Sequence, residues 1–309
     1  MSHDTAMAIG QLRSLTGKFD IAAKDAAKAL VYPTLCTQVV SNGADEEYGM
    51  LGAVPGVREW LGDRDFKELR AAKFTIVNKT FESSILISRE NIADDRMGLY
   101  GPVFQAMGTR AALHPDTLLF NLIEAASSTV CLDGQYLIDD DHSWGDSGTQ
   151  DNNLTYNASD HTAVTAAEFK LGFNQALNAL TNFKDDRGEY LNGPIFDEGS
   201  QLVVVLGANY LYQVALDALA VRTVSAGGEN FVISRPKIIS TARYSSTTAF
   251  DLYKVDEPLR PYVFQAREPL RREMKGLDDI EEKGVKFMTE ARYNLGPGAW
   301  WAAVRTTFN

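Results

Sequence analysis

The sequence predicts an α+β fold, because strand and helix patterns follow one another without the regular alternation of an α/β protein. Residues 73–91, KFTIVNKTFESSILISREN, are β-branched and aromatic and alternate apolar with polar positions, as a strand does. Residues 201–206, QLVVVL, form a continuous apolar run, which is typical of a strand covered on both faces. Between these two strands, apolar residues recur at helical spacing from Val103 to Ile123.

The composition favours a folded protein with one large domain or two intergrown ones. The 309 residues are 45% hydrophobic and 23% charged, an ordinary globular balance. The 41 acidic residues outnumber the 30 basic ones and give a net charge of -11, so the basic face of a dedicated duplex-DNA binder is not expected. Residues 1–10 lack a signal-peptide pattern, and no apolar run reaches about 18 residues. We therefore expect synthesis in a cytoplasm and no membrane partner.

The first part of the chain, residues 1–45, is expected to be an arm that lies outside the core. It is rich in small residues and only weakly patterned. One short helix is expected at residues 21–30, and Pro33 breaks the chain soon after it.

Residues 46–92 predict an extended hairpin. Within residues 73–91 the strand pattern extends over about 16 residues, longer than the usual 5–6, and we expect a strand of that length to project from its domain. The glycine-rich stretch at 46–70 can return the chain as a second strand, with Met50 and Trp60 among its apolar residues.

A long helix is expected over residues 101–126. Gly101 and Pro102 supply its start, because proline is favoured at the first helical position. Pro115 cannot donate to the helix ladder and disfavours helical geometry at His114, so a kink or break is predicted there.

The second half begins with a polar loop at residues 131–162. Thr165 and Glu168 then form a capping box, S/T-x-x-E. The helix after this box is expected to bury Phe169, Phe173, Ala176, Leu177 and Leu180. A further helix is expected at 209–219, and the remaining segments predict mostly strands and turns: NFVISRPKIIS, AFDLYKV, RPYVFQAR, GVKFMTEARYN and AWWAAVRTTF.

One short motif matches a catalytic pattern. Gly145-Asp146-Ser147-Gly148 reproduces the nucleophile tetrad of chymotrypsin-like proteases, with His114 and His142 upstream of it. Neither histidine lies in the matching context, and the long helix before the tetrad contradicts an all-β double barrel. A turn is the better interpretation, because glycine, aspartate and serine are common in turns.

Acidic residues gather at Asp139, Asp140 and Asp141, beside His142 and near Asp133. A calcium loop needs alternate acidic residues and a glycine at a set position, and this spacing is absent. The pattern favours a solvated acidic loop. Phosphate-binding and zinc-protease motifs are also absent, so we predict no catalytic, cofactor-binding or metal-binding residue.

We expect structural roles for the remaining charged, aromatic and cysteine residues. The basic residues between Arg260 and Lys275 precede the acidic ones between Asp278 and Glu282, which indicates ion pairing within or between subunits. The aromatic group Tyr293, Trp300 and Trp301 is expected in the core or in a subunit interface. The two cysteines, Cys36 and Cys131, form no CxxC pair, so reduced thiols are expected.

Several separated motifs resemble those of the Mu-like phage major head subunit family, in the same order and over roughly residues 45–309. Residues 136–138 depart from the family pattern, and residues 1–45 are less diagnostic. The matching motifs are Trp60-x-Gly62-x-Arg64, Lys79-x-Phe81-Glu82, Asp94-Asp95-x-x-Gly98-x-Tyr100, His114-Pro115-Asp116, Cys131-x-Asp133-Gly134-Gln135, Asp139-x-Asp141-His142 and Ala291-Arg292-x-Asn294-x-Gly296-x-Gly298-x-Trp300.

This resemblance implies the Hong Kong 97-like capsid fold. It also implies a major capsid protein of a tailed bacteriophage, which forms pentamers and hexamers and builds an icosahedral shell around double-stranded DNA. Expected partners besides the chain itself are scaffold, portal and decoration proteins, with only weak, non-specific DNA contact. The implied parts are an N-terminal arm (1–45), an extended hairpin loop (46–92), a peripheral domain with a spine helix (93–130), an axial domain (131–275) and C-terminal strands returning to both domains (276–309).

The sequence leaves two alternatives open. A protein nanocompartment of the encapsulin type shares the fold but encloses enzymes instead of a genome. A hydrolase that uses Ser147 is the second, and weaker, alternative. The resemblance implies no enzyme activity and a location in the virion capsid after assembly in the host cytoplasm.

Overall fold

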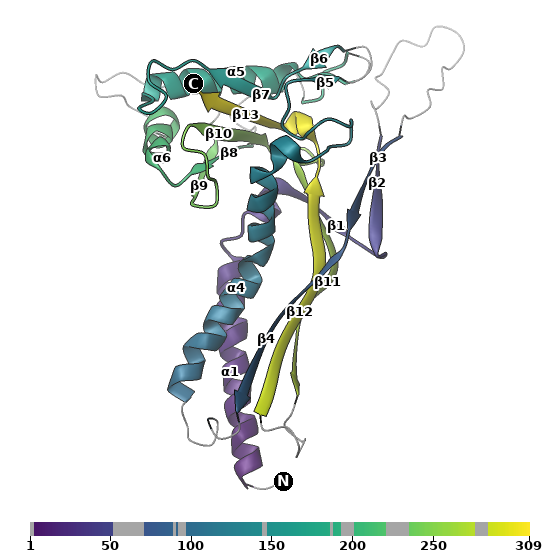
Figure 1. The fold of residues 1–309 in the computed structure, drawn as a ribbon, viewed down its shortest axis with the longest axis vertical. Coiled ribbons are helices and arrows are strands. Elements are labelled where there is room, and N and C mark those ends of the chain that lie inside the picture. The colour runs from purple at the N-terminus through teal and green to yellow at the C-terminus, as the bar shows by residue number, and fades with distance from the viewer. Residues whose placement is uncertain are drawn as a thin grey trace.

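The computed structural model describes residues 3–51, 71–88, 91, 97–143, 147–185, 188–192, 201–220, 235–275 and 284–309. Figure 1 shows two parts: a compact lobe, which holds the C-terminus, and a long lobe, which carries the N-terminus at its far end. Both combine helices with sheets, so the predicted α+β class is confirmed. Among the helices of the described ranges, none is long and apolar enough to cross a bilayer.

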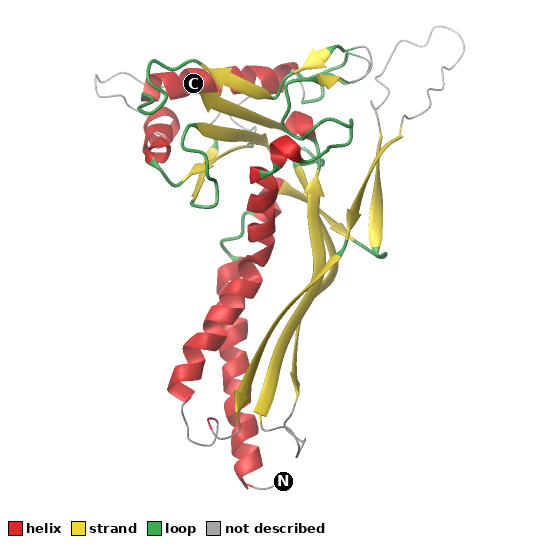
Figure 2. Ribbon diagram, in the orientation of Figure 1, coloured by secondary structure: helices red, strands yellow, loops and turns green. Residues whose placement is uncertain are grey.

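The long lobe is built on a four-stranded sheet with the order β1-β11-β12-β4. Its strands are β1 (Cys36–Val40), β11 (Tyr262–Lys275), β12 (Gly284–Pro297) and β4 (Lys79–Ser88). β1 runs parallel to β11, and the other pairs are antiparallel. Helices α1 (His3–Ala27) and α4 (Met97–Glu124) lie together along one face of this sheet (Figure 2).

The two helices approach closely because of one glycine. A Cβ atom at Gly108 of α4 would lie 2.3 Å from the Phe19 carbonyl oxygen of α1, so a side chain there would force the helices apart. Beside this crossing, the Phe287 ring of β12 packs between Phe19 and Phe104, at centroid distances of 5.3 and 4.8 Å. The buried cluster here comprises Leu15, Phe19, Ile87, Phe104, Val285 and Phe287.

The expectation that residues 1–45 lie outside the core was wrong for Leu15, Phe19, Leu35 and Cys36, which are buried, whereas the assignment of this segment as an arm stays a prediction. The short helix expected at 21–30 is a 25-residue helix that begins at His3. Its residues Leu15 and Phe19 are buried. The weak apolar pattern of α1 is sufficient because α4 and the sheet supply its partner surface.

Helix α4 is continuous through both prolines. It begins at Met97, before the expected start at Pro102, and it is not broken at His114 and Pro115; the other predicted outcome there, a kink, stays a prediction. Tertiary contacts on either side of Pro115 explain this continuity. The His114 Nδ1 atom lies 2.7 Å from the Tyr293 hydroxyl of β12. The Asp116 carboxylate accepts hydrogen bonds from the backbone at the start of α2 (Tyr32–Leu35).

A separate two-stranded sheet, here called the ribbon, pairs β2 (Asp45–Leu51) with antiparallel β3 (Ala71–Val77). The ribbon lies to the side of the long lobe in Figure 1. The single strand predicted at 73–91 is thus two strands, β3 and β4, which lie in different sheets and are separated by Asn78. The predicted return strand is confirmed as β2, whereas residues 52–70, with Trp60, lie outside the described residues.

The compact lobe contains a five-stranded sheet with the order β7-β13-β10-β8-β9. Every residue of β8 and β10 is buried, as predicted for the apolar run in β8. The strands are β7 (Asn153–Tyr156), β13 (Ala303–Phe308), β10 (Ala249–Lys254), β8 (Leu202–Gly207) and β9 (Lys237–Thr241).

Two predicted helices complete the compact lobe. The capping box of Thr165 and Glu168 is present at the start of α5 (Ala166–Asn182), which buries all five predicted residues. Asn209 caps α6 (Tyr210–Ala215), and a π-helical turn, η2 (Leu216–Ala220), extends it. Short elements are 3-10 turns η1 (Ala126–Ser128) and η3 (Trp300–Ala302), and the hairpin of β5 (His142–Ser143) with β6 (Thr149–Gln150).

Candidate functional site

The first candidate region is the root of the ribbon, residues 41–46 and 78, where the chain passes between the ribbon and the long sheet. One oxygen of the Glu46 carboxylate accepts hydrogen bonds from the Asn42 and Gly43 backbone N–H groups and from the Ser41 hydroxyl, at 2.7, 3.0 and 2.9 Å. These bonds, the one from Asn42 foremost, lower the pKa of Glu46 below its ordinary value. The carboxylate therefore orders the turn before β2.

Asn78 joins this turn to the point where β3 becomes β4. Its side-chain amide donates to the Ser41 hydroxyl and to the Gly43 carbonyl, at 2.8 and 3.0 Å. Its backbone N–H donates to the Ala44 carbonyl, also at 3.0 Å. Both chain crossings at the root of the ribbon are thus hydrogen-bonded to each other.

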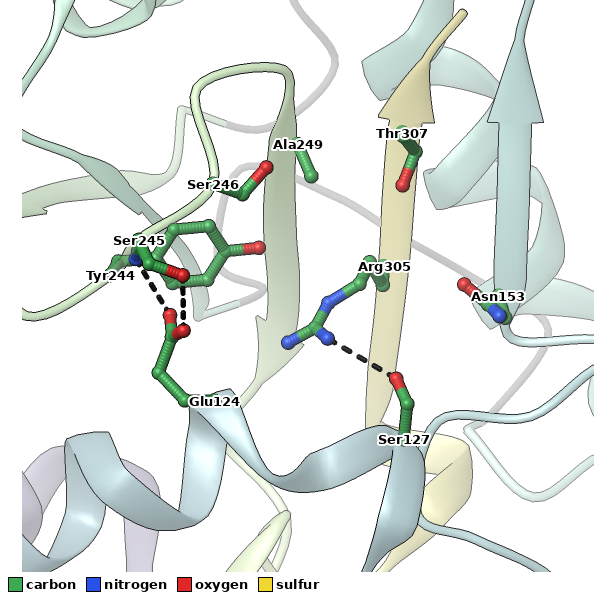
Figure 3. Close-up of a pocket in the computed structure, with 9 residues that line it drawn as sticks. All are labelled: Glu124, Ser127, Asn153, Tyr244, Ser245, Ser246, Ala249, Arg305 and Thr307. Atoms are coloured by element: carbon green, nitrogen blue, oxygen red, sulfur yellow. Dashed lines mark hydrogen bonds between the residues drawn. The ribbon is translucent and has the colours of Figure 1, made fainter.

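The second candidate region is a cavity of about 350 Å³ where the end of α4 meets the compact lobe (Figure 3). The Arg305 guanidinium forms two bonds to the buried Asp251 carboxylate, Nε to Oδ1 at 2.7 Å and a terminal nitrogen to Oδ2 at 2.8 Å. The same terminal nitrogen donates to the Ile123 carbonyl of α4 at 3.0 Å. The cavity is lined by Glu124, Ser127, Asn153, Tyr244, Ser245, Ser246, Ala249, Arg305 and Thr307.

Both charged side chains that line this cavity are hydrogen-bonded within the subunit, Arg305 to Asp251 and Glu124 to Ser245. Figure 3 shows the Glu124 carboxylate at the end of α4 with both oxygens on Ser245, one on its backbone N–H and one on its hydroxyl. Burial, and next the Asp251 charge, raise the pKa of the Tyr244 hydroxyl, which donates to Asp251. The arrangement is suited to joining the two lobes rather than to catalysis.

Ser147, the residue of the protease-like tetrad, follows β5 and precedes β6. The His142 ring is fully buried, bonds Asp133 through Nδ1 at 2.6 Å and stacks on Trp300 at a centroid distance of 4.1 Å. The Nε2 atom of His142 has no hydrogen-bond partner within the described residues, and His114 bonds Tyr293. Neither histidine is placed as a base for Ser147, since a base must reach the nucleophile. Residues 144–146 of the tetrad lie outside the described residues.

The acidic loop keeps the solvated character that the sequence indicated. One carboxylate oxygen from each of Asp139, Asp140 and Asp141 lies within 4.8 Å of the other two, and Asp140 and Asp141 are exposed. The Asp139 carboxylate already accepts hydrogen bonds from the backbone N–H groups of Tyr136 and Asp140.

The basic stretch from Arg260 to Lys275 is paired within the subunit. Arg260 donates to the carbonyls of Pro33 and Thr34, which fixes β11 to α2. The acidic residues that were expected as partners, at 278–282, lie outside the described residues. The observed ion pairs are Arg271–Glu268, Arg272–Asp20 and Lys275–Glu273.

The aromatic group and the cysteines have structural positions. Tyr293, Trp300 and Trp301 lie in the hydrophobic core, one of the two places expected for them. Cys36 and Cys131 are free and buried thiols. Burial, and next the Asp116 charge, raise the pKa of Cys36; burial and the Asp133 charge do the same for Cys131.

Two buried polar residues, Asp251 and Gln265, were not predicted from the sequence. Asp251 and Gln265 are both fully buried, and each lies within an apolar strand, AFDLYK and YVFQAR respectively. A single polar residue inside a buried strand is the signal that could have identified them, because buried polar groups need partners.

Known proteins of similar sequence are phage head subunits. The family model of the Mu-like prophage major head subunit gpT matches residues 11–180, more than half of the chain. The major capsid protein of Escherichia phage Mu is 40% identical over 111 residues, which cover 36% of each protein. The Mu-like prophage FluMu major head subunit of Haemophilus influenzae is 36% identical over 138 residues, 44% of this chain and 45% of that protein. The matched segments thus span less than half the length of either relative.

Solved capsid structures share the fold. The capsid of cyanophage P-SCSP1u superposes with a TM-score of 0.61 at 13% identity, covering 91% of this chain and 88% of that one. The capsid of bacteriophage JBD30 superposes with a TM-score of 0.53 at 20% identity, covering 89% of this chain and 64% of that one. A virus-like particle from Pyrococcus furiosus superposes with a TM-score of 0.55 at 11% identity, covering 94% of this chain and 98% of that one. The fold is that of Hong Kong 97-like capsid proteins, and with the match over residues 11–180 this chain belongs to the Mu-like prophage major head subunit family.

Proposed function

We propose that this chain is the major capsid protein of a tailed phage, a structural protein that assembles into the icosahedral shell around double-stranded DNA. The observation that carries the proposal is the head-subunit family match over residues 11–180, on a chain with a capsid fold. Pentamers and hexamers are the expected capsomers, because repeated head-to-tail contacts form closed rings when the rotation fits.

The ribbon is the proposed assembly element. It forms a two-stranded sheet of its own, which contacts the long sheet through Ile76. A two-stranded sheet is only marginally stable in water, so we expect a further partner surface. Exposed strand edges also pair readily with other chains. A neighbouring subunit is therefore the proposed partner of the ribbon. The candidate apolar contacts are Met50 and Trp60, with Arg64, Lys67 and Glu68 at the polar rim; all of these except Met50 lie outside the described residues.

The charge of the chain agrees with a container wall. A net charge of -11 disfavours tight binding of packaged DNA, so the contact with DNA is proposed to be weak and non-specific. Scaffold, portal and decoration proteins are the further proposed partners, with assembly in the host cytoplasm.

Electron microscopy and size-exclusion chromatography of the purified protein test the proposal. We expect rings or closed shells, whereas a compact monomer at all concentrations would contradict it. The head-subunit family match supports a phage shell over a nanocompartment of the encapsulin type. Particles from infected or induced cells should contain DNA; shells that hold enzymes instead would favour the nanocompartment.

Limited proteolysis tests the role of the ribbon. We expect cleavage between Gly49 and Lys79 in unassembled protein and strong protection of the same segment in particles. Equal cleavage in both states would show that the neighbouring subunit does not cover the ribbon. As a check on the hydrolase alternative, we expect no peptide hydrolysis by the unmodified protein and unchanged assembly of Ser147→Ala; hydrolysis that Ser147→Ala abolishes would favour the hydrolase.

A further inference from the structure

A single buried glutamine connects the ribbon to the long sheet. Gln265 of β11 is fully buried. Its side-chain nitrogen donates to the Ile76 carbonyl of β3 at 3.1 Å, and its side-chain oxygen accepts from the Tyr48 hydroxyl of β2 at 2.8 Å. One amide therefore holds both strands of the ribbon, an arrangement here called the Gln265 bridge.

The groups that meet Gln265 are themselves held in place. The Tyr48 ring stacks on Phe74 across the ribbon, with centroids 5.1 Å apart and planes 19° apart. The Ile76 side chain is buried against β12, where a Cβ atom at Gly296 would lie 2.6 Å from its terminal methyl group. The space left by Gly296 thus allows β3 to approach the long sheet closely enough for the bridge to form.

The hydrogen bond from Tyr48 persists over the physiological pH range. Burial, and next the Glu46 charge, raise the pKa of Tyr48 to about 12, so its hydroxyl stays protonated and donates to Gln265. A glutamine suits this position because its amide offers a donor and an acceptor at once.

We propose that Gln265 is a positioning residue that sets the direction in which the ribbon leaves the subunit, and that shell assembly depends on this direction. The inference rests on the proposed capsid function and adds that Gln265 orients the ribbon, the proposed assembly element. The root of the ribbon, residues 41–46 and 78, fixes the two chain crossings; the bridge fixes the strands beyond them. Without the bridge the ribbon would pivot about its root, and subunits would meet their neighbours over a range of angles.

Two variants separate the bridge from general stability. Gln265→Met nearly keeps the side-chain volume but removes both hydrogen bonds, so the Tyr48 hydroxyl loses its acceptor and the Ile76 carbonyl loses its side-chain donor. Tyr48→Phe removes one bond and keeps the ring stack on Phe74. Tyr212→Phe, a partly exposed tyrosine on α6, is the matched control.

The measurements are amide hydrogen exchange in unassembled subunits, thermal melting and the yield of closed shells. We expect exchange at residues 45–51 and 71–77 to be about fivefold faster or more in Gln265→Met, with a smaller rise in Tyr48→Phe. Exchange in the compact lobe and the melting of the control should match the unmodified protein. The yield of closed shells should fall in the same order, with irregular assemblies in their place.

Unchanged exchange in the ribbon, or normal shell yield despite faster exchange, would overturn the inference. If Gln265→Met does not fold, Tyr48→Phe decides the question by the same two readouts. If the unmodified protein forms no shells at all, the proposed function fails, while the exchange rates still show whether Gln265 holds the ribbon.

Discussion

The compact lobe and the long lobe bury their sheets to different degrees. In the compact lobe, β8 and β10 are buried along their whole length. In the long lobe, helices α1 and α4 cover one face of the sheet (Figure 2), and most of β4 remains exposed, with Leu86 64% exposed. The compact lobe thus has a core covered on both sides, whereas the long lobe is a thin layer with open surface.

This difference in burial predicts different roles for the two lobes, one in the stability of the subunit and the other in its proposed assembly. A sheet buried on both faces gains its stability from contacts within the subunit. The long lobe and the ribbon have a larger exposed surface, which under the proposed function would contact neighbouring subunits. Substitutions in the compact lobe should therefore change unfolding, and substitutions in the ribbon should change assembly.

The largest expected effect is in the core of the compact lobe. Phe250 is fully buried, with the rings of Phe169 and Phe308 at 4.8 and 5.9 Å. Phe250→Ala should lower the free energy of unfolding by about 4 kcal/mol, measured by urea denaturation of unassembled subunits. Leu86→Ala on the open face of the long lobe should change it by less than about 0.5 kcal/mol. Similar losses at both positions would remove the contrast between the lobes.

The junction of the lobes should give the next largest effect. Asp251→Asn leaves the Arg305 guanidinium buried without its counter-charge, so we expect a loss of about 3 kcal/mol in the free energy of unfolding. Asp217→Asn on the exposed side of η2 is the control and should stay within about 0.5 kcal/mol. A neutral result for Asp251→Asn would show that this ion pair does not stabilise the position of Arg305, whose terminal nitrogen also donates to the Ile123 carbonyl of α4.

A pH dependence should identify the Glu168 carboxylate, which binds both Ser159 and its capping-box partner Thr165. Hydrogen bonds from Ser159, and next from Thr165, lower the pKa of Glu168 to about 2, below its ordinary 4.5. Because the folded-state pKa is depressed, the stabilisation is present above about pH 4.5 and is lost as the pH falls toward 2. Glu168→Gln should therefore be less stable than the unmodified protein at pH 7, and this gap should shrink by pH 3. Parallel stability curves for the two proteins, measured by thermal melting between pH 7 and pH 3, would contradict the assignment.

The smallest expected effect concerns thiol reactivity. Cys36 and Cys131 are 1% and 4% exposed, so both should react slowly with an alkylating reagent in the native subunit. Cys36 should react faster than Cys131, because it lies in β1, an edge strand of the long sheet, whose local opening costs less. In denaturant without reductant, mass spectrometry should find both thiols modified. A disulfide, or the reverse order of rates, would contradict this prediction.

Local patterns predicted the elements whose residues act on near neighbours in the chain. The capping box of Thr165 and Glu168, the buried face of α5 and the buried strand β8 all follow from spacing within a few residues. The family motifs were also identified from the sequence, and the structure shows what some of them do: Asp116 holds the start of α2, and Asp133 holds His142. The boundaries of the arm, hairpin, peripheral and axial parts stay predictions.

Only the tertiary structure decided the rest, because distant segments supply the deciding contacts. Helix α1 enters the core because Gly108 lets α4 approach it, and α4 continues through Pro115 because β12 and α2 bind it on both sides. The strand pattern at 73–91 is divided at Asn78 because each half finds a different partner strand, β2 or β12. Local propensity is weak compared with such packing and hydrogen bonding, so the sequence determined which elements could form, and long-range contacts determined where they begin, end and pair.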